Sequence, residues 1–252
     1  MTVQPTEILA LIPARGGSKS IPRKNILPFG DHPLIAYSIQ AGLASEYVSR
    51  VVVSTDDQEI AEVAQKYGAE LPFLRPEQYA QDHTPDFPVF QHALSWLKEN
   101  EGYVPRMVVH LRPTSPLRKV YHIDQAVLRL LKHPEADSVR SVSEPSQNPY
   151  KMWRIEPEGY LEPLLESEYD EPYNMPRQAL PEVYWHNGYV DALWADTITQ
   201  KGSMTGDHIL PLVISPENWI DLDTKRDWRK AESLLRDGQI SWSELGFSLD
   251  DA

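Results

Sequence analysis

The sequence contains no cysteine. Disulfide bonds, zinc sites built on thiolates and a catalytic thiol are therefore excluded. The sequence also has no apolar run close to the roughly 20 residues needed to span a bilayer. Its first residues, MTVQPTEILALIPA, lack the basic start and the small-residue cleavage site of a signal peptide. These absences predict a cytoplasmic protein without a membrane partner.

Positive charge is scarce, because 24 basic side chains stand against 37 acidic ones and give a formal net charge of −13. Such a surface repels nucleic acid and anionic membranes at long range, so neither is expected as a partner. Near the N-terminus, however, four cations lie within ten residues: Arg15, Lys19, Arg23 and Lys24. This local cluster in an acidic protein indicates a small polyanionic ligand.

The cations belong to the stretch LIPARGGSKSIPRKN, which follows an apolar run. The stretch matches neither the G-x-x-x-x-G-K-[ST] phosphate loop nor the G-x-G-x-x-G dinucleotide loop. Gly16 and Gly17 nevertheless allow a close backbone approach to an anion, and their N–H groups can form a nest. Arg15 and Lys19 would bring charge onto phosphates. The alternative interpretation is a solvated basic loop in an acidic protein.

Strand and helix patterns alternate through the first half of the 252-residue chain, whose 41% hydrophobic content suffices for one large domain. Strands are predicted at 8–14, 50–54, 71–76, 107–112 and 137–142. Helices are predicted after Pro33, after a capping box at 55–58, over 85–99 and around 123–131. This order predicts an α/β fold with a mostly parallel sheet flanked by helices. The loops 15–30, 54–57, 75–86 and 112–118 should then meet at the carboxyl edge of the sheet.

The pattern changes over residues 145–187, which are rich in proline, acids and aromatics. A β-hairpin is predicted there, around Glu158-Gly159, in an excursion suited to dimer contacts or to a lid. Strand patterns return at 188–195, 209–214 and 218–223, and a last helix is predicted over 224–236. The chain is thus predicted to form a single domain over 1–236 that includes this excursion, followed by an acidic, peripheral tail over 237–252.

Two further segments carry candidate chemistry. Asp221 and Asp223 are two residues apart, so on an extended chain they point the same way and can hold Mg²⁺. Asp223 as the N-cap of the last helix is the alternative. The loop HLRPTSPLR, which is stiffened by two prolines, brings Arg112, Thr114, Ser115 and Arg118 to the sheet edge, where a rigid turn is the alternative interpretation.

Taken in order, eight motifs resemble those of the acylneuraminate cytidylyltransferase family: ARGGSKSIPRKN, VVVSTDD, LRPE, LRPTSPLR, NPYK, MPRQALP, NGYV and DLDT. The match covers roughly residues 8–236. The resemblance implies a nucleotide-diphospho-sugar transferase type of fold and an excursion that builds a homodimer. It also implies the reaction of CTP with a nonulosonic acid to give a CMP-sugar and pyrophosphate, with Mg²⁺ as cofactor.

The resemblance also implies roles for individual residues. Catalytic roles fall on Arg15, Lys19, Asp221 and Asp223, of which the two aspartates would coordinate Mg²⁺. Nucleotide-binding roles fall on Gly16, Gly17, Ser18, Lys24, Asn25, Arg75, Thr84 and Asp86. Sugar-binding roles fall on Arg112, Thr114, Ser115, Lys151, Arg177 and Asn187. Two of these roles have structural alternatives, namely a helix N-cap for Asp86 and a salt bridge at the sheet edge for Arg112.

Three positions depart from the family pattern. Arg112 stands where Gln is frequent, Trp185-His186 where Arg-Pro is frequent, and Asp191 where Tyr is frequent. All three would lie near the sugar, so the acceptor stays open among eight- and nine-carbon 2-keto-3-deoxy acids. The alternatives are a same-fold enzyme for another acceptor, such as 3-deoxy-octulosonate, and an inactive nucleotide-sensing subunit.

Overall fold

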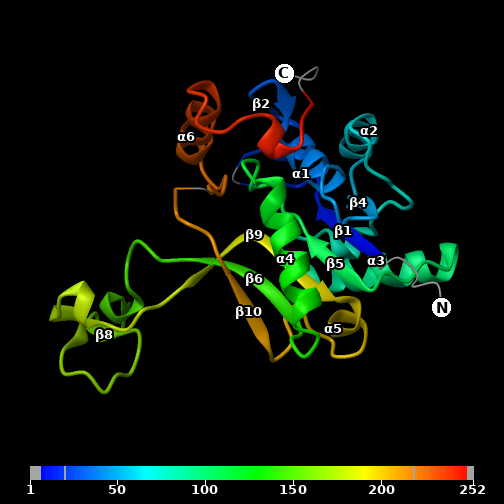
Figure 1. Cartoon of the computed structure of the whole chain (residues 1–252). Helices are drawn as coiled ribbons and strands as arrows, with labels where there is room; N and C mark the ends of the chain where they lie inside the picture. The colour runs from blue at the N-terminus through cyan, green and yellow to red at the C-terminus, as the bar shows by residue number, and fades with distance from the viewer. Residues whose placement is uncertain (1–6, 20, 218, 249–252) are drawn as a thin grey trace.

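A six-stranded sheet forms the centre of the molecule in a computed structural model that describes residues 7–19, 21–217 and 219–248 (Figure 1). Its strand order is β10-β6-β9-β5-β1-β4. The strands are β1 (Ile8–Pro13), β4 (Arg50–Ser54), β5 (Met107–His110), β6 (Ser138–Ser143), β9 (Trp185–Trp194) and β10 (Ile209–Val213).

Five of these strands point in one direction. Strand β1 is parallel to β4 and β5, and β10 is parallel to β6, whereas β9 pairs antiparallel with both β5 and β6. The predicted mostly parallel α/β fold is confirmed, with β9 as the exception. The loops that leave β1, β4 and β5 consequently emerge at one edge of the sheet.

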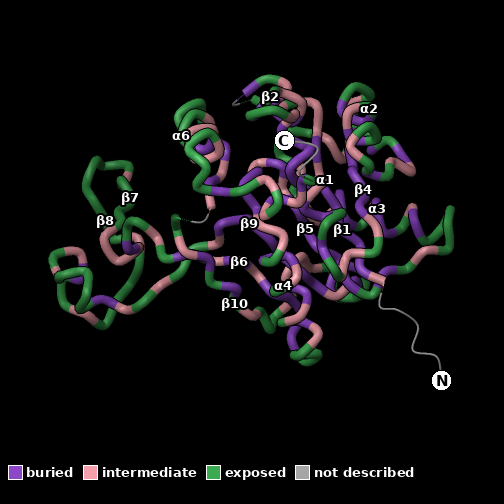
Figure 2. Tube along the Cα trace, turned by 45° about the horizontal axis from the view of Figure 1, so that its top comes forward, coloured by how far each residue is buried: buried purple, intermediate pink, exposed green. Residues whose placement is uncertain are grey.

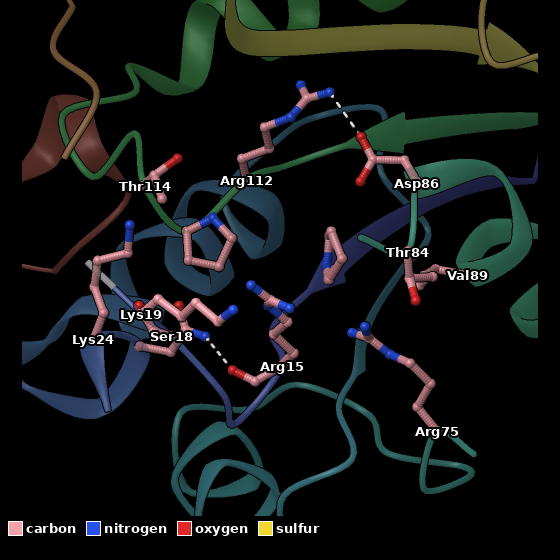
Figure 3. Close-up of a pocket in the computed structure, with 13 residues that line it drawn as sticks. Arg15, Ser18, Lys19, Lys24, Arg75, Thr84, Asp86, Val89, Arg112 and Thr114 are labelled. Carbon is pink, nitrogen blue, oxygen red and sulfur yellow. Dashed lines mark hydrogen bonds and ion pairs between the residues drawn. The ribbon is translucent and has the colours of Figure 1, made fainter. Parts of the chain in front are cut away.

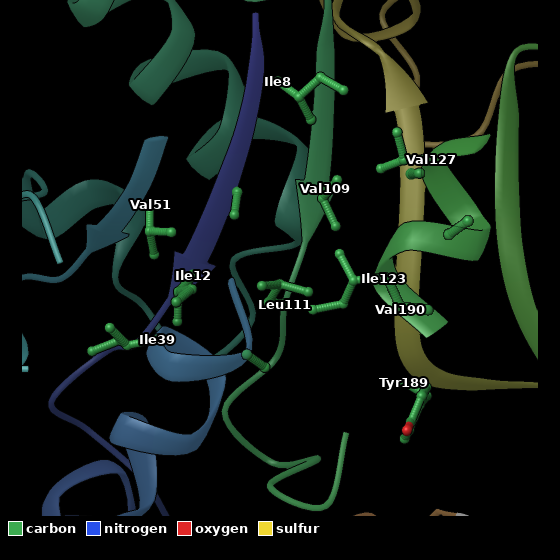
Figure 4. Close-up of a cluster of buried hydrophobic side chains, with 14 of the residues drawn as sticks. Ile8, Ile12, Ile39, Val51, Val109, Leu111, Ile123, Val127, Tyr189 and Val190 are labelled. Carbon is green, nitrogen blue, oxygen red and sulfur yellow. The ribbon is translucent and has the colours of Figure 1, made fainter. Parts of the chain in front are cut away.

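Helices cover both faces of the sheet. They are α1 (Leu34–Leu43), α2 (Gln58–Lys66), α3 (Asp86–Glu101), α4 (Val120–Lys132), α5 (Ala195–Thr199) and α6 (Lys225–Arg236). On one face, apolar side chains of α1, α2 and α4, such as Ile39, Ile60 and Ile123, pack on β1, β4 and β5 (Figure 4). On the other face, α3 and α5 pack on the remaining side chains of the same strands. The strands are apolar on both sides for this reason.

The tail after α6 is not peripheral, so this prediction is wrong for the part that the structure describes. Ile240, Leu245 and Phe247 are buried in a third apolar cluster with α1 and the ribbon β2 (Pro28–Phe29) and β3 (His32–Pro33). The ring of Phe247 stacks on His32 at 4.4 Å between centroids. Residues 249–252 lie outside the described part of the chain.

The excursion projects from the body as a separate arm, joined to it by extended segments that lead out of β6 and into β9 (Figure 1). Its predicted hairpin is confirmed by β7 (Trp153–Ile155) and β8 (Leu161–Pro163), which pair antiparallel. Most of the arm is exposed or half-buried, in contrast to the buried strands of the sheet (Figure 2). It therefore contributes little to the core of its own chain.

Three local predictions are wrong. Residues 71–76 lie outside the sheet, where Pro72 and Pro76 cannot donate to a ladder. Residues 219–223 do not form a strand either, and residue 218 is outside the described part. The capping box at 55–58 is replaced by a single cap, because Asp57 accepts a hydrogen bond from the Ile60 N–H at 3.0 Å.

Candidate active site

A cavity of about 440 Å³ opens at the carboxyl edge of the sheet. Three of the four loops predicted to meet there line it, namely those after β1, before α3 and after β5. Its lining residues are Pro13, Arg15, Ser18, Lys19, Lys24, Asn25, Arg75, Thr84, Asp86, Val89, Arg112, Pro113 and Thr114. In the view of Figure 3, Arg15 lies between Lys24 on one side and Arg75 on the other, with Arg112 and Asp86 joined at the far end. The cavity is thus cationic within an acidic protein.

The fourth loop, 54–57, supports the first loop from behind. The Gly16 N–H donates to Asp56 Oδ1 at 3.0 Å, and a Cβ on Gly16 would come within 2.7 Å of Asp57 Oδ2. Glycine is required here because Asp57 occupies the space of a side chain. The prediction of an anion nest at Gly16 is therefore wrong, since the Gly16 N–H already has an acceptor. Neither Gly16 nor Gly17 lines the cavity.

Arg15 and Lys19 share one carboxylate. Arg15 Nη1 lies 3.0 Å from Asp82 Oδ1, and Lys19 forms an ion pair with Asp82 Oδ2. The hydrogen bond from Lys19, together with the charge of Arg15, holds the pKa of Asp82 below its ordinary value. Asp82 thus occupies the position of an anionic ligand between the two cations.

Lys24 is buried beside the cavity. Its Nζ donates to the Leu222 carbonyl at 2.8 Å, which ties the first loop to the segment before α6. Burial lowers the pKa of Lys24, and the carboxylates of Asp223 and Asp221 oppose that effect. Lys24 therefore brings the first loop and the two aspartates together, although they are about 200 residues apart.

Asp221 has an oxygen without a partner. Within the described residues, its Oδ1 is buried and accepts no hydrogen bond, while the side chain of Thr114 donates to the carboxylate. Burial raises its pKa, and the neighbouring Asp223 adds to the rise. The alternative role for Asp223 is excluded, because the N-cap of α6 is Thr224, in a capping box with Asp227. Asp223 stays exposed.

This pair fits Mg²⁺, which is commonly held by one or two carboxylates and completed by substrate phosphates and water. An orphaned carboxylate oxygen is what an oxygen-seeking cation would satisfy. No group of three or more His, Cys, Asp or Glu side chains that could hold a metal ion is found among the described residues. The remaining ligands would accordingly come from the substrate and from water.

Arg75 ties the loop before α3 (residues 75–86) to the end of β4. Its guanidinium donates to Ser54 Oγ at 3.0 Å, to the Ser54 carbonyl and to the Tyr79 carbonyl at 3.4 Å. Burial lowers its pKa to about 10, which leaves it cationic at neutral pH. Arg75 thus adds positive charge to the cavity wall while its donors hold the loop in place.

The Asp86 carboxylate pairs with Arg112 at 3.1 Å, where the first turn of α3 meets the loop after β5 (Figure 3). The N-cap of α3 is Pro85, so the capping alternative for Asp86 is excluded. Burial works to raise the pKa of Asp86, but the nearby His110 and Arg112 lower it below its ordinary value. Arg112 also pairs with Asp191 at 3.0 Å, which confirms the salt-bridge alternative for this arginine.

The comparisons with known proteins agree on one family. The sequence pattern of the cytidylyltransferase family matches residues 9–156. The N-acylneuraminate cytidylyltransferase of Escherichia coli O18:K1:H7 is 33% identical over 229 residues, which are 91% of this chain and 52% of that protein. The CMP-N,N′-diacetyllegionaminic acid synthase of Legionella pneumophila is 34% identical over 229 residues, which are 90% of this chain and 96% of that protein.

The chain belongs to the cytidylyltransferase family. It spans about half the length of the first relative and nearly all of the second. A solved CMP:2-keto-3-deoxy-manno-octonic acid synthetase, in complex with CTP, shares its fold at a TM-score of 0.67. That likeness covers 92% of this chain and 99% of the other at 18% identity, and it therefore shows the fold alone.

Eight predicted site residues of this cytidylyltransferase chain do not line the cavity: Gly16, Gly17, Asp221 and Asp223, described above, and Ser115, Lys151, Arg177 and Asn187. Ser115 is buried. Asn187 is a structural residue instead, because its amide bonds Ser141, Ser143 and the Tyr189 N–H. Lys151 donates to two carbonyls of the arm, at Tyr173 and Met175, and Arg177 donates to the Pro145 carbonyl. Neither cation reaches the cavity of its own chain.

Sequence reasoning about this member of the cytidylyltransferase family also missed residues that shape the site: Asp82, Arg140 and, as an ion-pair partner, Asp191. Arg118 was expected at this edge of the sheet, but its complete burial was not. Asp82 sits in an irregular loop, and no pattern indicated its two cationic partners. Arg140 lies within a predicted strand, where a cation in the middle of apolar and small residues was the available signal. The family match ends at residue 156, so it does not extend to Asp191, Asp221 or Asp223.

None of the helices in the described ranges combines the length and the apolar character needed to cross a membrane.

Proposed function

We propose that this chain activates a nonulosonic acid with CTP and yields a CMP-sugar and pyrophosphate. The single observation that carries the proposal is the cavity at the carboxyl edge of the sheet, where Arg15, Lys19, Lys24 and Arg75 converge. The two relatives above support the class of acceptor, because their names specify N-acylneuraminate and N,N′-diacetyllegionaminic acid.

The chemistry is the attack of the anomeric hydroxyl on the α-phosphate of CTP, in line with the departing pyrophosphate. A protein accelerates such a step by orienting the two substrates and by stabilising the charge that develops on the leaving group. Arg15 and Lys19 would hold the β- and γ-phosphates and stabilise that charge. The shared Asp82 would release them when the triphosphate binds.

The rest of the cavity would hold the nucleoside. Lys24 and Asn25 lie next to the first loop, and the Asn25 amide donates to the Arg15 carbonyl at 3.0 Å, which fixes that loop. Thr84 and Asp86 line the opposite end, where a carboxylate can accept a hydrogen bond from the amino group of cytosine. Water would be displaced from the cavity by the base and ribose.

Asp221 and Asp223 would hold Mg²⁺ next to Lys24 and Thr114. When bound, this ion supplies charge neutralisation on the phosphate oxygens and acidifies the attacking hydroxyl. The contribution of the chain is to fix the two carboxylates, because Leu222 between them donates its N–H to the Thr114 carbonyl at 2.8 Å and accepts from Lys24.

Replacing Asp221 by asparagine is expected to raise the Mg²⁺ concentration for half-maximal rate about tenfold, since an amide oxygen carries no charge and binds a hard cation more weakly. The measurement is pyrophosphate release across a Mg²⁺ titration. Asp196→Asn on the exposed face of α5 is the control. An unchanged Mg²⁺ dependence in the Asp221 variant would refute its role as a ligand.

Replacing Asp82 by asparagine is expected to tighten CTP binding. Asp82 competes with the triphosphate for Arg15 and Lys19, so removing its charge frees both cations. Because the pairs are exposed, the Kd for CTP should fall only about two- to fivefold. The difference should shrink as salt is raised. Calorimetric titration measures it, with Glu77→Gln, an exposed acid of the same loop, as control; equal or weaker binding by the Asp82 variant contradicts the competition.

We also propose a homodimer built by the arm. Five apolar side chains of residues 152–161 are exposed by 38% or more in the single chain: Met152, Trp153, Ile155, Tyr160 and Leu161. Clustered apolar exposure of this kind marks an interaction site in a folded protein. Lys151 and Arg177 would then lie near the partner subunit. Sedimentation equilibrium decides between one copy and two.

The alternatives have weaker support. Relatives above 30% identity over nine-tenths of the chain carry nonulosonic acids in their names, whereas the octonic acid synthetase shares only the fold. An inactive sensing subunit has no use for a carboxylate pair beside the phosphate loop.

Pyrophosphate release with CTP, Mg²⁺ and a panel of nonulosonic acids tests the proposed function. We expect release with at least one nine-carbon acid and none without an acceptor. Release with 3-deoxy-octulosonate alone would favour the other acceptor class. CTP binding without release for any acid would favour the sensing subunit.

A further inference from the structure

Three strands place His110, Asp191 and Arg140 in one row across the sheet. In register, Asp191 of β9 pairs with His110 of β5 on one side and with Arg140 of β6 on the other. Directly opposed residues of antiparallel strands point to the same face. His110 ends β5 just before the loop that lines the cavity. The row therefore lies at the edge of the sheet that carries the site.

Asp191 is a buried anion with three partners. Its side chain is 4% exposed, and its carboxylate lies 3.0 Å from Arg112 Nη1, 3.4 Å from Arg140 Nε and 3.2 Å from His186 Nε2. Burial by itself would raise the pKa of Asp191, but the bond with His186 and the charges of Arg112 and Arg140 lower it far below its ordinary value. Asp191 is thus ionised and gathers cationic groups around itself.

Arg112 is fully engaged in this network. One end of its guanidinium contacts Asp86, and the other contacts Asp191 and the Gly188 carbonyl at 3.3 Å. Gly188 has a φ of +68°, a backbone conformation that favours glycine, and its carbonyl oxygen accepts this hydrogen bond from Arg112. With two carboxylates on one guanidinium, Arg112 shapes the wall but has no free charge for an acceptor.

Arg140 is less engaged than Arg112. Within the described residues, its Nε is buried without a hydrogen bond, and its closest terminal nitrogen contacts Asp191 at only 3.5 Å. A quarter of its side chain is exposed. Among the described residues, Asp191 is its one carboxylate partner, and Asp191 is shared with Arg112. Arg140 therefore keeps a donor without a hydrogen bond, and it is joined to the cavity wall through Asp191 and Arg112.

We infer that Asp191 is a positioning residue for the acceptor and that Arg140, which it holds, binds the acceptor carboxylate. A planar guanidinium matches a carboxylate in bidentate fashion, and a 2-keto sugar acid carries one beside the attacking hydroxyl. The inference rests on the proposed function. Among the residues predicted to bind the sugar, Arg112 is engaged elsewhere, and neither Lys151 nor Arg177 reaches the cavity of its own chain, whereas Arg140, two strands from Arg112, has a donor without a partner.

The test compares two variants in pyrophosphate release with CTP and the acceptor that wild-type protein uses. Arg140→Met keeps the aliphatic stem and removes the guanidinium, and Asp191→Asn keeps the shape and removes the charge. Loss of one charge-assisted contact should raise the KM for the acceptor about tenfold to a hundredfold. The KM for CTP should stay within about twofold, and Arg140→Lys should recover part of the loss because it restores the charge.

A matched control is Asp137→Asn. Asp137 is likewise a buried aspartate in an ion pair, with Lys201, but it precedes β6 at the opposite edge of the sheet. Its replacement should lower the melting temperature and leave both KM values unchanged. The control therefore separates a general loss of stability from a loss of acceptor positioning. Arg140→Met serves where Asp191→Asn fails to fold.

The outcomes separate the two proposals. Active wild-type protein with an unchanged acceptor KM in Arg140→Met overturns this inference alone. An equal rise in both KM values assigns the network a structural role and also overturns it. Wild-type protein that releases no pyrophosphate with any nonulosonic acid overturns the proposed function, and this inference with it.

Discussion

Replacing Lys19 by alanine is expected to lower kcat about 100- to 1,000-fold, the usual cost of losing one group that stabilises developing charge. The side chain of Lys19 is 73% exposed, and it forms an ion pair with Asp82. It contributes little to the fold, so the free energy of unfolding should stay within about 0.5 kcal/mol of wild type. The effect therefore belongs to the transition state and not to stability.

Steady-state kinetics of pyrophosphate release measure this effect, with circular dichroism as a check on folding. Lys132→Ala, which removes the same charge from an exposed position on α4, is the control and should leave kcat unchanged. A Lys19 variant that keeps near-normal kcat and only raises the KM for CTP would show that Lys19 binds ground state and transition state alike. That result would contradict its role with the leaving group.

The sequence was most informative for elements whose structure follows from their own residues. Short apolar runs such as those in Ile8–Pro13 and Arg50–Ser54 are typical of strands covered on both faces, and the positions of these two strands were predicted well. The order of strands and helices then placed the cationic loop after the first strand at the carboxyl edge of the sheet. Ten of the predicted site residues line one cavity for that reason.

Contacts between segments far apart in the sequence could not be predicted from the sequence. Lys24 reaches Leu222 across 198 residues, and Arg112 reaches Asp191 across 79. No local pattern encodes such partners, because charge alone does not say which opposite charge will be nearest once the chain folds. The antiparallel β9 was unpredictable for a similar reason, since its apolar run GYVDALWA fits either strand direction.

The predictions for the C-terminal tail and for residues 71–76 were wrong for a different reason. Apolar residues at 240, 245 and 247 are too sparse to form an amphipathic pattern, yet a pocket between α1 and the β2–β3 ribbon buries them. Residues 71–76 have strand-like composition, but two prolines remove the donors that a ladder needs. In both cases the contacts with the rest of the fold determine the structure of the segment, and its own composition does not.

Replacing Arg118 by leucine is expected to destabilise the protein by about 3–5 kcal/mol, because three acceptors lose their donor inside the protein. Arg118 is fully buried. Its guanidinium donates to the Tyr189 carbonyl of β9, to Ser38 Oγ of α1 at 2.9 Å and to the Arg112 carbonyl at 2.7 Å. Burial lowers its pKa to about 10, so the group stays charged at neutral pH.

Equilibrium unfolding in urea measures this loss as a lower midpoint at an unchanged slope. Arg129→Leu, the same substitution on the exposed face of α4, is the control and should shift the midpoint little. Arg118→Lys should be intermediate, because an ammonium keeps the charge but cannot serve three acceptors in a plane. A leucine variant within about 1 kcal/mol of wild type would mean that the acceptors find other donors. The loop that carries Arg112 and Thr114 to the cavity would then be held by its prolines and by α4, and not by this arginine.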